Sequence, residues 1–152
     1  RRGPFTSVTL WHALEHDPAP RATLRWIRAR LAPDGVLVIE VPDGTSRLAR
    51  ALGDRWAGLH TPRHVSLFEP ASLRRLCEAA GFVVETHRRH GTLPPYTLVA
   101  LTLADRAGFR FGRHPAWALF PAWALGLVAS WPSLRPPGAE ALALQILQAR
   151  PA

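Results

Sequence analysis

The sequence predicts an α/β domain built on a largely parallel sheet. Strand-like and helix-like segments alternate between residues 5 and 86 in the order β-α-β-α-α-β. One of the strands, residues 36–41 (Val-Leu-Val-Ile-Glu-Val), is a nearly continuous apolar run between Gly35 and Pro42, which is typical of a strand buried on both faces. Alternation of this kind builds parallel sheets with right-handed crossovers.

The elements that precede this strand follow from local patterns. Residues 5–11 alternate apolar and polar side chains, as a strand does. A helix is expected over residues 21–31, because Leu24 and Ile27 lie on one helical face. The segment Pro33-Asp34-Gly35 would end that helix and lead into the buried strand.

Three further elements are expected after the buried strand. Ser46 is a suitable N-cap for a short helix that runs to Leu52. Glu69-Pro70 opens a second helix, which Gly81 ends, and residues 82–86 then form a strand.

The composition limits the class of protein. With 152 residues, of which 47% are apolar, the chain can form one globular domain. A net charge of +8, carried on the basic side by Arg alone, favours anionic partners. Cys77 is the only cysteine, so an internal disulfide is excluded, and its apolar helical surroundings predict a buried, inert thiol. Nucleic acid is not expected as a partner, because no basic stripe with interleaved aromatic residues occurs.

The sequence past Gly91 is mostly apolar, and two helices joined by residues 108–115 fit it best. The run 115–131 has no Asp, Glu, Lys or Arg, but as a helix it would rise only about 26 Å, which is short for a membrane span. We expect residues 92–131 to contact either an anionic membrane surface or a second copy of the chain. The side chains behind this expectation are Trp117, Trp123 and Trp131 with the flanking Arg110 and Arg113.

Two rules conflict in the final segment, residues 139–149. Its Ala, Glu, Leu and Gln favour a helix, whereas Leu142, Leu144 and Ile146 alternate as in a strand. Local patterns leave both structures open.

Three motifs occur in a recognisable order. They are Trp11-His-Ala-Leu-Glu-His16, Leu31-Ala-Pro-Asp-Gly35 and His60-Thr-Pro-Arg-His64. Together with their flanking strands, they resemble the C-terminal half of class I S-adenosylmethionine-dependent methyltransferases, in particular the group that acts on small molecules. The resemblance covers residues 5–86 well and the remainder loosely.

The resemblance implies a Rossmann-like, seven-stranded sheet, of which this chain would carry strands 4 to 7. Residues 5–11, 36–41 and 82–86 would be strands 4, 5 and 6, and residues 139–149 would be the antiparallel strand 7. The chain would then divide into residues 1–91, the C-terminal half of the catalytic domain; residues 92–135, an apolar helical insertion; and residues 136–152, which carry the final strand.

The family's glycine-rich cofactor turn and its ribose-binding acid both precede strand 4. No Gly-x-Gly occurs in this chain, which also lacks Met and opens with Arg1-Arg2-Gly3. We therefore expect a fragment that is inactive alone. The intact enzyme would use S-adenosyl-L-methionine to methylate a small molecule, and we expect it in the cytoplasm, either free or peripheral on the membrane. A non-catalytic truncated domain, serving as a membrane-associated or oligomerising module, is the alternative.

Candidate site residues follow the first strand. In the resemblance, Trp11 and His12 would flank the cofactor, and Glu15 or His16 would orient or deprotonate the acceptor. The alternative is a polar connection in which the histidines are incidental. The spacing also matches the His-x-x-Glu-His motif of zinc hydrolases, but Asp17-Pro-Ala-Pro20 leaves too few residues for the helix that motif needs, so no metal is expected.

A second set of candidates lies in the loop 60–64. Arg63 is suited to bind a carboxylate or phosphate, with His60 beside it, and His64 can accept a proton near neutral pH. The alternative is a surface loop in which Trp56 and Phe68 pack and the histidines are solvated. On the first interpretation the substrate is a small and anionic molecule.

Overall fold

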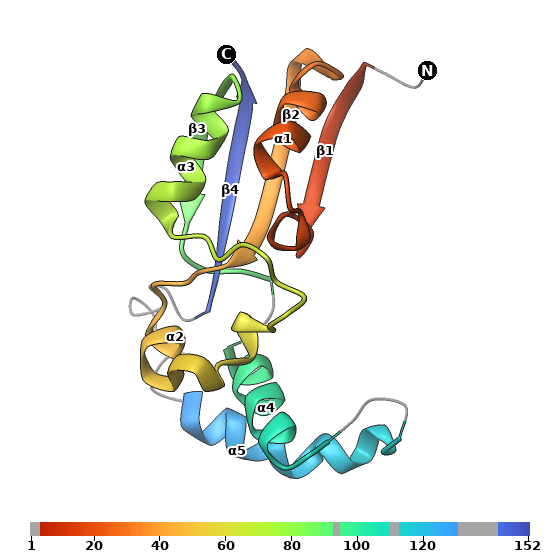
Figure 1. Cartoon of the computed structure of the whole chain (residues 1–152), viewed down its shortest axis with the longest axis vertical. Helices are drawn as coiled ribbons and strands as arrows, with labels where there is room; N and C mark the ends of the chain where they lie inside the picture. Colours follow the sequence, from red (N-terminus) through yellow and green to blue (C-terminus); the bar gives the residue numbers. More distant parts are fainter. Residues whose placement is uncertain (1–3, 93–94, 110–112, 131–142) are drawn as a thin grey trace.

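The computed structural model describes residues 4–92, 95–109, 113–130 and 143–152. A four-stranded sheet has the order β1-β2-β4-β3, with β1 at Phe5–Trp11, β2 at Leu31–Pro42, β3 at Phe82–Arg88 and β4 at Leu144–Pro151. Helices α1 (Pro20–Arg28) and α3 (Pro70–Ala79) contact each other and lie over one face of the sheet (Figure 1). The α/β class predicted from the sequence is confirmed.

The sheet is mixed because its last strand enters between two earlier ones. Strand β2 is parallel to β1, whereas β4 is antiparallel to both β2 and β3. The conflict over the final segment is thus resolved in favour of a strand, which pairs on both edges and begins at Leu144. Residues 136–142 of the predicted final unit lie outside the described part of the chain.

The main core lies between this sheet and the two helices. Leu24 and Ile27 of α1 and Leu73 and Cys77 of α3 belong to one buried cluster with Leu37, Ile39 and Val41 of β2, and with Leu147 and Ala149 of β4. The predicted burial of Cys77 is confirmed. The expectation that the strand 36–41 is buried on both faces holds toward its carboxyl end, where Ile39, Glu40 and Val41 are all buried. Val36 and Val38 are only half-buried, because α1 and α3 cover the opposite face.

The boundary between α1 and β2 also differs from the expectation. Helix α1 ends at Arg28, and β2 begins at Leu31, so Pro33-Asp34-Gly35 lies inside a strand rather than between elements. Pairing explains this: Phe5 lies opposite Leu31, and the register then shifts before Ser7 pairs with Val36. The irregular ladder accommodates the three residues that look like a helix stop in the sequence.

The remaining helices lie beyond the end of the sheet at which β1 and β2 finish (Figure 1). They are α2 (Arg47–Leu52), α4 (Pro95–Arg106) and α5 (Phe120–Ser130), the last preceded by a 3-10 turn at Ala116–Leu119. The predicted cap of α2 is present, since Oγ of Ser46 accepts a hydrogen bond from the Ala49 amide. Helices α4 and α5 pack closely at Gly126, where an added Cβ would lie 2.6 Å from the Tyr96 carbonyl oxygen.

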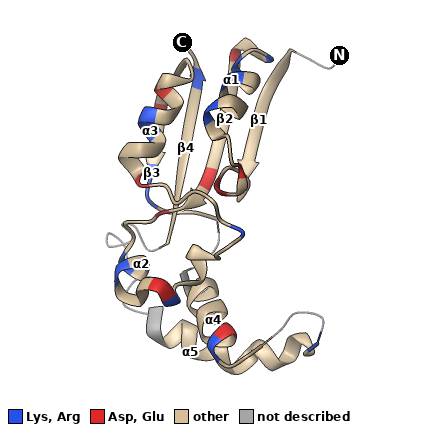
Figure 2. Cartoon of the chain, in the orientation of Figure 1, with Lys and Arg blue, Asp and Glu red and all other residues tan. Residues whose placement is uncertain are grey.

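Within the described residues, no helix is long and apolar enough to cross a membrane. Figure 2 shows that the described part of α5 carries no charged side chain. Arg110 and Trp131, which the sequence analysis assigned to this surface, lie outside the described residues.

A candidate active site at the carboxyl end of β1

The site begins where β1 ends. His12 follows Trp11 with φ of 47°, in the left-handed region, and its amide donates a hydrogen bond to the Glu40 carbonyl. This turn leads into a 3-10 helix at Leu14–His16. The single turn is too short to present His12 and His16 on one helical face, so the zinc-hydrolase arrangement is not formed.

His12 lies between two buried carboxylates. Its Nδ1 atom is 3.5 Å from Oε1 of Glu15, and its Nε2 atom is 3.0 Å from Oε1 of Glu40. The interaction with Glu15 is the main cause that raises the pKa of His12; both carboxylate charges add to it, and partial burial opposes it. The side chain therefore favours the imidazolium form more than an ordinary histidine does.

Glu40 is a member of this site that the sequence analysis missed. It is fully buried, and Thr92 donates to it twice, from the amide to Oε2 (2.7 Å) and from Oγ1 to Oε1 (2.8 Å). In the sequence Glu40 is simply one acid within an apolar strand. The available signal was its place near the carboxyl end of β2, where it pairs with Trp11.

Glu15 joins the two loops of the site. Its carbonyl oxygen accepts hydrogen bonds from the Val65 and Ser66 amides, which hold the 60–66 segment against the turn after β1. Its carboxylate is fully buried, and neither oxygen has a hydrogen-bond partner within the described residues. Nε2 of His64 is 3.9 Å from Oε1 of this carboxylate.

The imidazoles of the site are oriented by backbone carbonyls. Nδ1 of His64 donates to the Gly58 carbonyl (2.8 Å), and Nδ1 of His16 donates to the Arg63 carbonyl (2.9 Å). The His64 ring meets the His16 ring edge to face at 4.7 Å and the His60 ring at 5.2 Å. Burial is the main cause that lowers the pKa of His64, so this ring is neutral near pH 7.

Most of the sequence-predicted candidates therefore lie together. Glu15, His16, His60 and His64 form one cluster, and His12 contacts it through Glu15. Arg63 takes part through its carbonyl, while its side chain is exposed.

Two aromatic residues pack as expected in the alternative interpretation, that of a surface loop. Trp56 is buried against Leu98 and Leu144, and Phe68 belongs to the main core. Trp11, by contrast, is 47% exposed at the end of β1. The loop thus combines packed aromatic rings with imidazoles that remain accessible or half-buried.

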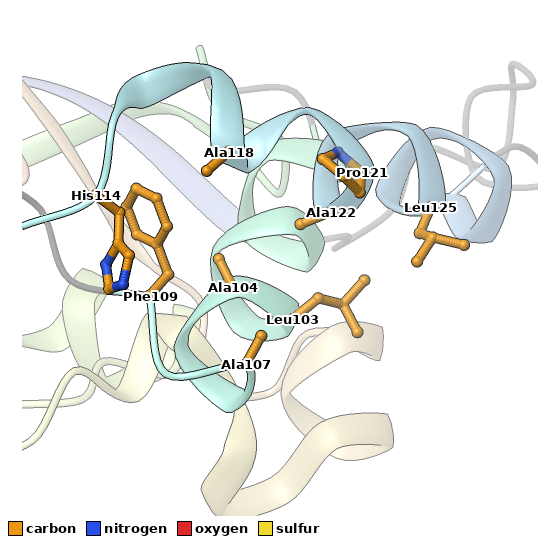
Figure 3. A pocket seen from close by; sticks show the side chains of 9 residues that line it. All are labelled: Leu103, Ala104, Ala107, Phe109, His114, Ala118, Pro121, Ala122 and Leu125. Atoms are coloured by element: carbon orange, nitrogen blue, oxygen red, sulfur yellow. The ribbon is translucent and has the colours of Figure 1, made fainter.

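A separate apolar pocket of about 470 Å³ lies between α4 and α5 (Figure 3). It is lined by Leu103, Ala104, Ala107, Phe109, His114, Ala118, Pro121, Ala122 and Leu125. None of the titratable groups clustered at the end of β1 lines it, so we do not place the chemistry there.

Comparison with known proteins identifies the family of the chain. A family model described as a methyltransferase domain matches residues 1–87, more than half of the chain. A search of curated proteins found no match.

Several solved structures share the fold, among them the following three. The [4+2]-cyclase SpnF is 19% identical with a TM-score of 0.53, and the match covers 97% of this chain and 50% of SpnF. A putative sarcosine dimethylglycine methyltransferase from Galdieria sulphuraria is 14% identical with a TM-score of 0.54, covering 96% and 52% of the two chains. Phosphoethanolamine N-methyltransferase 2 of Haemonchus contortus, in complex with S-adenosyl-L-methionine, is 14% identical with a TM-score of 0.56, covering 97% and 33%.

The chain thus spans about half the length of the first two structures and a third of the other. The family match includes β1, α1, β2, α2, α3 and most of β3, and with them every candidate site residue except Thr92. The chain belongs to the methyltransferase domain family.

Proposed function

We propose that the protein transfers a methyl group from S-adenosyl-L-methionine to a small-molecule acceptor and that this chain supplies the acceptor side of the site. The observation that carries the proposal is the cluster of Glu15, His64 and the His12–Glu40 pair at the carboxyl end of β1. In open α/β sheets, ligands bind in the crevice at that end of the strands.

Trp11 and His12 are the residues that would contact the cofactor. The exposed Trp11 ring fits a role as one wall of a cofactor site, because it offers an accessible apolar surface and Trp11 pairs with Glu40 of the neighbouring strand. The cofactor would supply an electrophilic methyl group on a sulfonium, whose leaving group is neutral. With no Gly-x-Gly turn, this chain alone offers only one wall, so we expect calorimetry on it to show weak or no binding. Micromolar affinity would contradict this division of roles.

Residues of the two loops would position the acceptor and take up its proton. An acceptor reacts through a lone pair, so the protein must position it and take up its proton. His64 suits this task because its Nδ1–H is held by the Gly58 carbonyl, which leaves Nε2 as the basic atom. Glu15, 3.9 Å away, would stabilise the imidazolium once it forms, and His16 packs against the same ring.

His60 and Arg63 would set the class of acceptor. Both are exposed and lie in the loop that carries His64. A guanidinium binds a carboxylate or phosphate through paired hydrogen bonds, so an anionic small molecule is the proposed substrate.

The test compares His64→Gln with His90→Gln in single-turnover assays of the protein that contains this chain. Loss of the general base should slow methyl transfer by about 10²- to 10⁴-fold, whereas the exposed His90 should have no effect. Thermal melts show whether each variant is folded. Equal rates for His64→Gln and the unaltered protein would refute the assigned role.

The apolar surface of α5 and the 3-10 turn before it supports a second proposal, that this segment associates with a membrane surface or with another copy of the chain. Trp117, Phe120 and Val128 are 77%, 75% and 74% exposed, which is unusual for side chains of this size. A non-catalytic module would use the same surface without the site.

A further inference from the structure

Three groups of the candidate site converge on one point. Glu15, His16 and His64 each offer an atom that can ligate a metal, and these three atoms lie within 4.8 Å of one another. Glu15 and His16 come from the turn after β1, and His64 comes from the loop before α3. The Val65 and Ser66 amides bind the Glu15 carbonyl, so the two segments are fixed relative to each other.

The Glu15 carboxylate lacks the partners that such a buried group needs. It is fully buried, and neither oxygen accepts a hydrogen bond within the described residues. His12 lies 3.5 Å and His64 3.9 Å from Oε1 of this carboxylate, and a ring nitrogen of His16 lies within 4.8 Å of it. Burying an ionised carboxylate is costly unless a cation or donors compensate it. A second cation beside Glu15 would supply that compensation.

Both histidines are held in the tautomer that a metal ion requires. A carbonyl oxygen can only accept, so the bonds to the Arg63 and Gly58 carbonyls place the proton on Nδ1 of His16 and His64. Each ring keeps its lone pair on Nε2. Histidine ligands of metals are oriented in this way, by a backbone carbonyl or carboxylate on the second ring nitrogen.

We propose that Glu15, His16 and His64 form a binding site for a divalent transition-metal ion of the Zn²⁺, Co²⁺ or Fe²⁺ type. Two imidazoles and one carboxylate suit these ions better than Mg²⁺ or Ca²⁺, which prefer oxygen ligands. Tetrahedral bonds of about 2.0–2.2 Å place ligand atoms roughly 3.4 Å apart, so atoms that are up to 4.8 Å apart would have to approach each other by about 1 Å. His16 is exposed, which leaves a path for the ion and open positions for another ligand.

The ligand set differs from the one that the His-x-x-Glu-His motif suggests. That motif pairs His12 with His16, but His12 faces Glu40 and Glu15 instead. The second histidine comes from a loop 48 positions further along (His16 to His64), which no local spacing rule would find. Metal binding does not rest on the proposed methyl transfer. The two uses of His64 exclude each other at any one time, because a bound ion would occupy the Nε2 lone pair that would otherwise take up the acceptor's proton.

The test titrates Co²⁺ into the metal-free chain and records the visible absorption spectrum. Four- or five-coordinate Co²⁺ bound by nitrogen and oxygen ligands absorbs visible light more strongly than the hydrated ion does. One equivalent should bind, and Zn²⁺ should displace it. Glu15→Gln, His16→Ala and His64→Ala should each weaken binding by more than about tenfold. His90→Ala, which removes an exposed imidazole elsewhere, should bind as the unaltered chain does.

Far-UV circular dichroism verifies that each variant is folded, and a second measurement avoids substitutions altogether. In ¹⁵N-resolved spectra, one equivalent of Zn²⁺ should shift the Nε2 signals of His16 and His64 and leave those of His90 in place. Absence of a stoichiometric Co²⁺ spectrum, or binding retained in folded Glu15→Gln and His64→Ala, would overturn the site. A protein that binds the metal but transfers no methyl group even when metal-free would refute the proposed function and keep the metal site.

Discussion

Nε2 of His12 lies 3.0 Å from Oε1 of Glu40, so one imidazole from the end of β1 is held against a fully buried carboxylate of the neighbouring strand. The same ring contacts Glu15 through Nδ1. A single side chain thus compensates two buried acids that come from different segments. Removing it should cost more than the loss of an ordinary surface histidine.

We expect His12→Gln to lower the free energy of unfolding by about 3 kcal/mol near pH 6, because it leaves two buried carboxylates without their cation. The pH dependence has a definite sign. The folded-state pKa of His12 is raised, so its stabilisation is complete below the usual histidine pKa of about 6.5 and is lost as the pH rises through the raised value. Urea unfolding of both proteins across this range should show the difference shrinking toward alkaline pH. A difference independent of pH would argue against the imidazolium.

Another buried acid gives a prediction with a matched control. Nη2 of Arg89 lies 2.8 Å from Oδ2 of the fully buried Asp43, and it also donates to Oγ1 of Thr45. Arg89→Ala should destabilise the fold by about 2–3 kcal/mol, since Asp43 would lose its charged partner. The adjacent Arg88 is exposed, and Arg88→Ala should stay within about 0.5 kcal/mol of the unaltered protein. Similar melting temperatures for the two variants would show that the pair contributes little.

Cys77 provides a probe of the core. Burial raises the pKa of its thiol to about 12, so almost no thiolate is present at pH 8 and the sulfur is shielded from reagents. We expect iodoacetamide to modify the native protein very slowly and the urea-unfolded protein at the rate of a free thiol. Mass spectrometry measures both rates. Fast labelling under native conditions would mean that α3 separates readily from the sheet.

The sequence predicts the residues of the site better than their contacts. Glu15, His16 and His64 were candidates because each follows a strand or lies in a polar loop, and loops at strand ends meet at one edge of the sheet. The role of Glu40 depends instead on which residues of β1 and β2 lie side by side. That register is set by the irregular pairing around residues 33–35, which look like a helix stop in the sequence.

In the fold, too, features set by local sequence are predicted and features set by strand pairing are not. Amphipathic spacing and caps predict α1, α2 and α3 to within a few residues, because those signals are local. The position of β4 between β2 and β3 does not follow from its own sequence, in which helix propensity and strand alternation compete. Pairing along both edges of β4 overrides the propensity. The strand numbers 4 to 7 remain a prediction of the resemblance.

The exposed apolar surface of α5 and the 3-10 turn before it yields the last prediction. Trp117, Phe120 and Val128 project from a segment without charged side chains, and Arg113 precedes it. We expect shallow, salt-sensitive binding to anionic vesicles, because apolar rings enter the headgroup region and each nearby Arg contributes about 1 kcal/mol that salt screens. Flotation of Trp117→Ser and Val128→Ser should show reduced binding, whereas Trp26→Ser, an exposed tryptophan on α1, should float as before. A dimer in solution that does not bind vesicles, and that dissociates in the Trp117→Ser and Val128→Ser variants, would instead identify this surface as a contact between two copies of the chain.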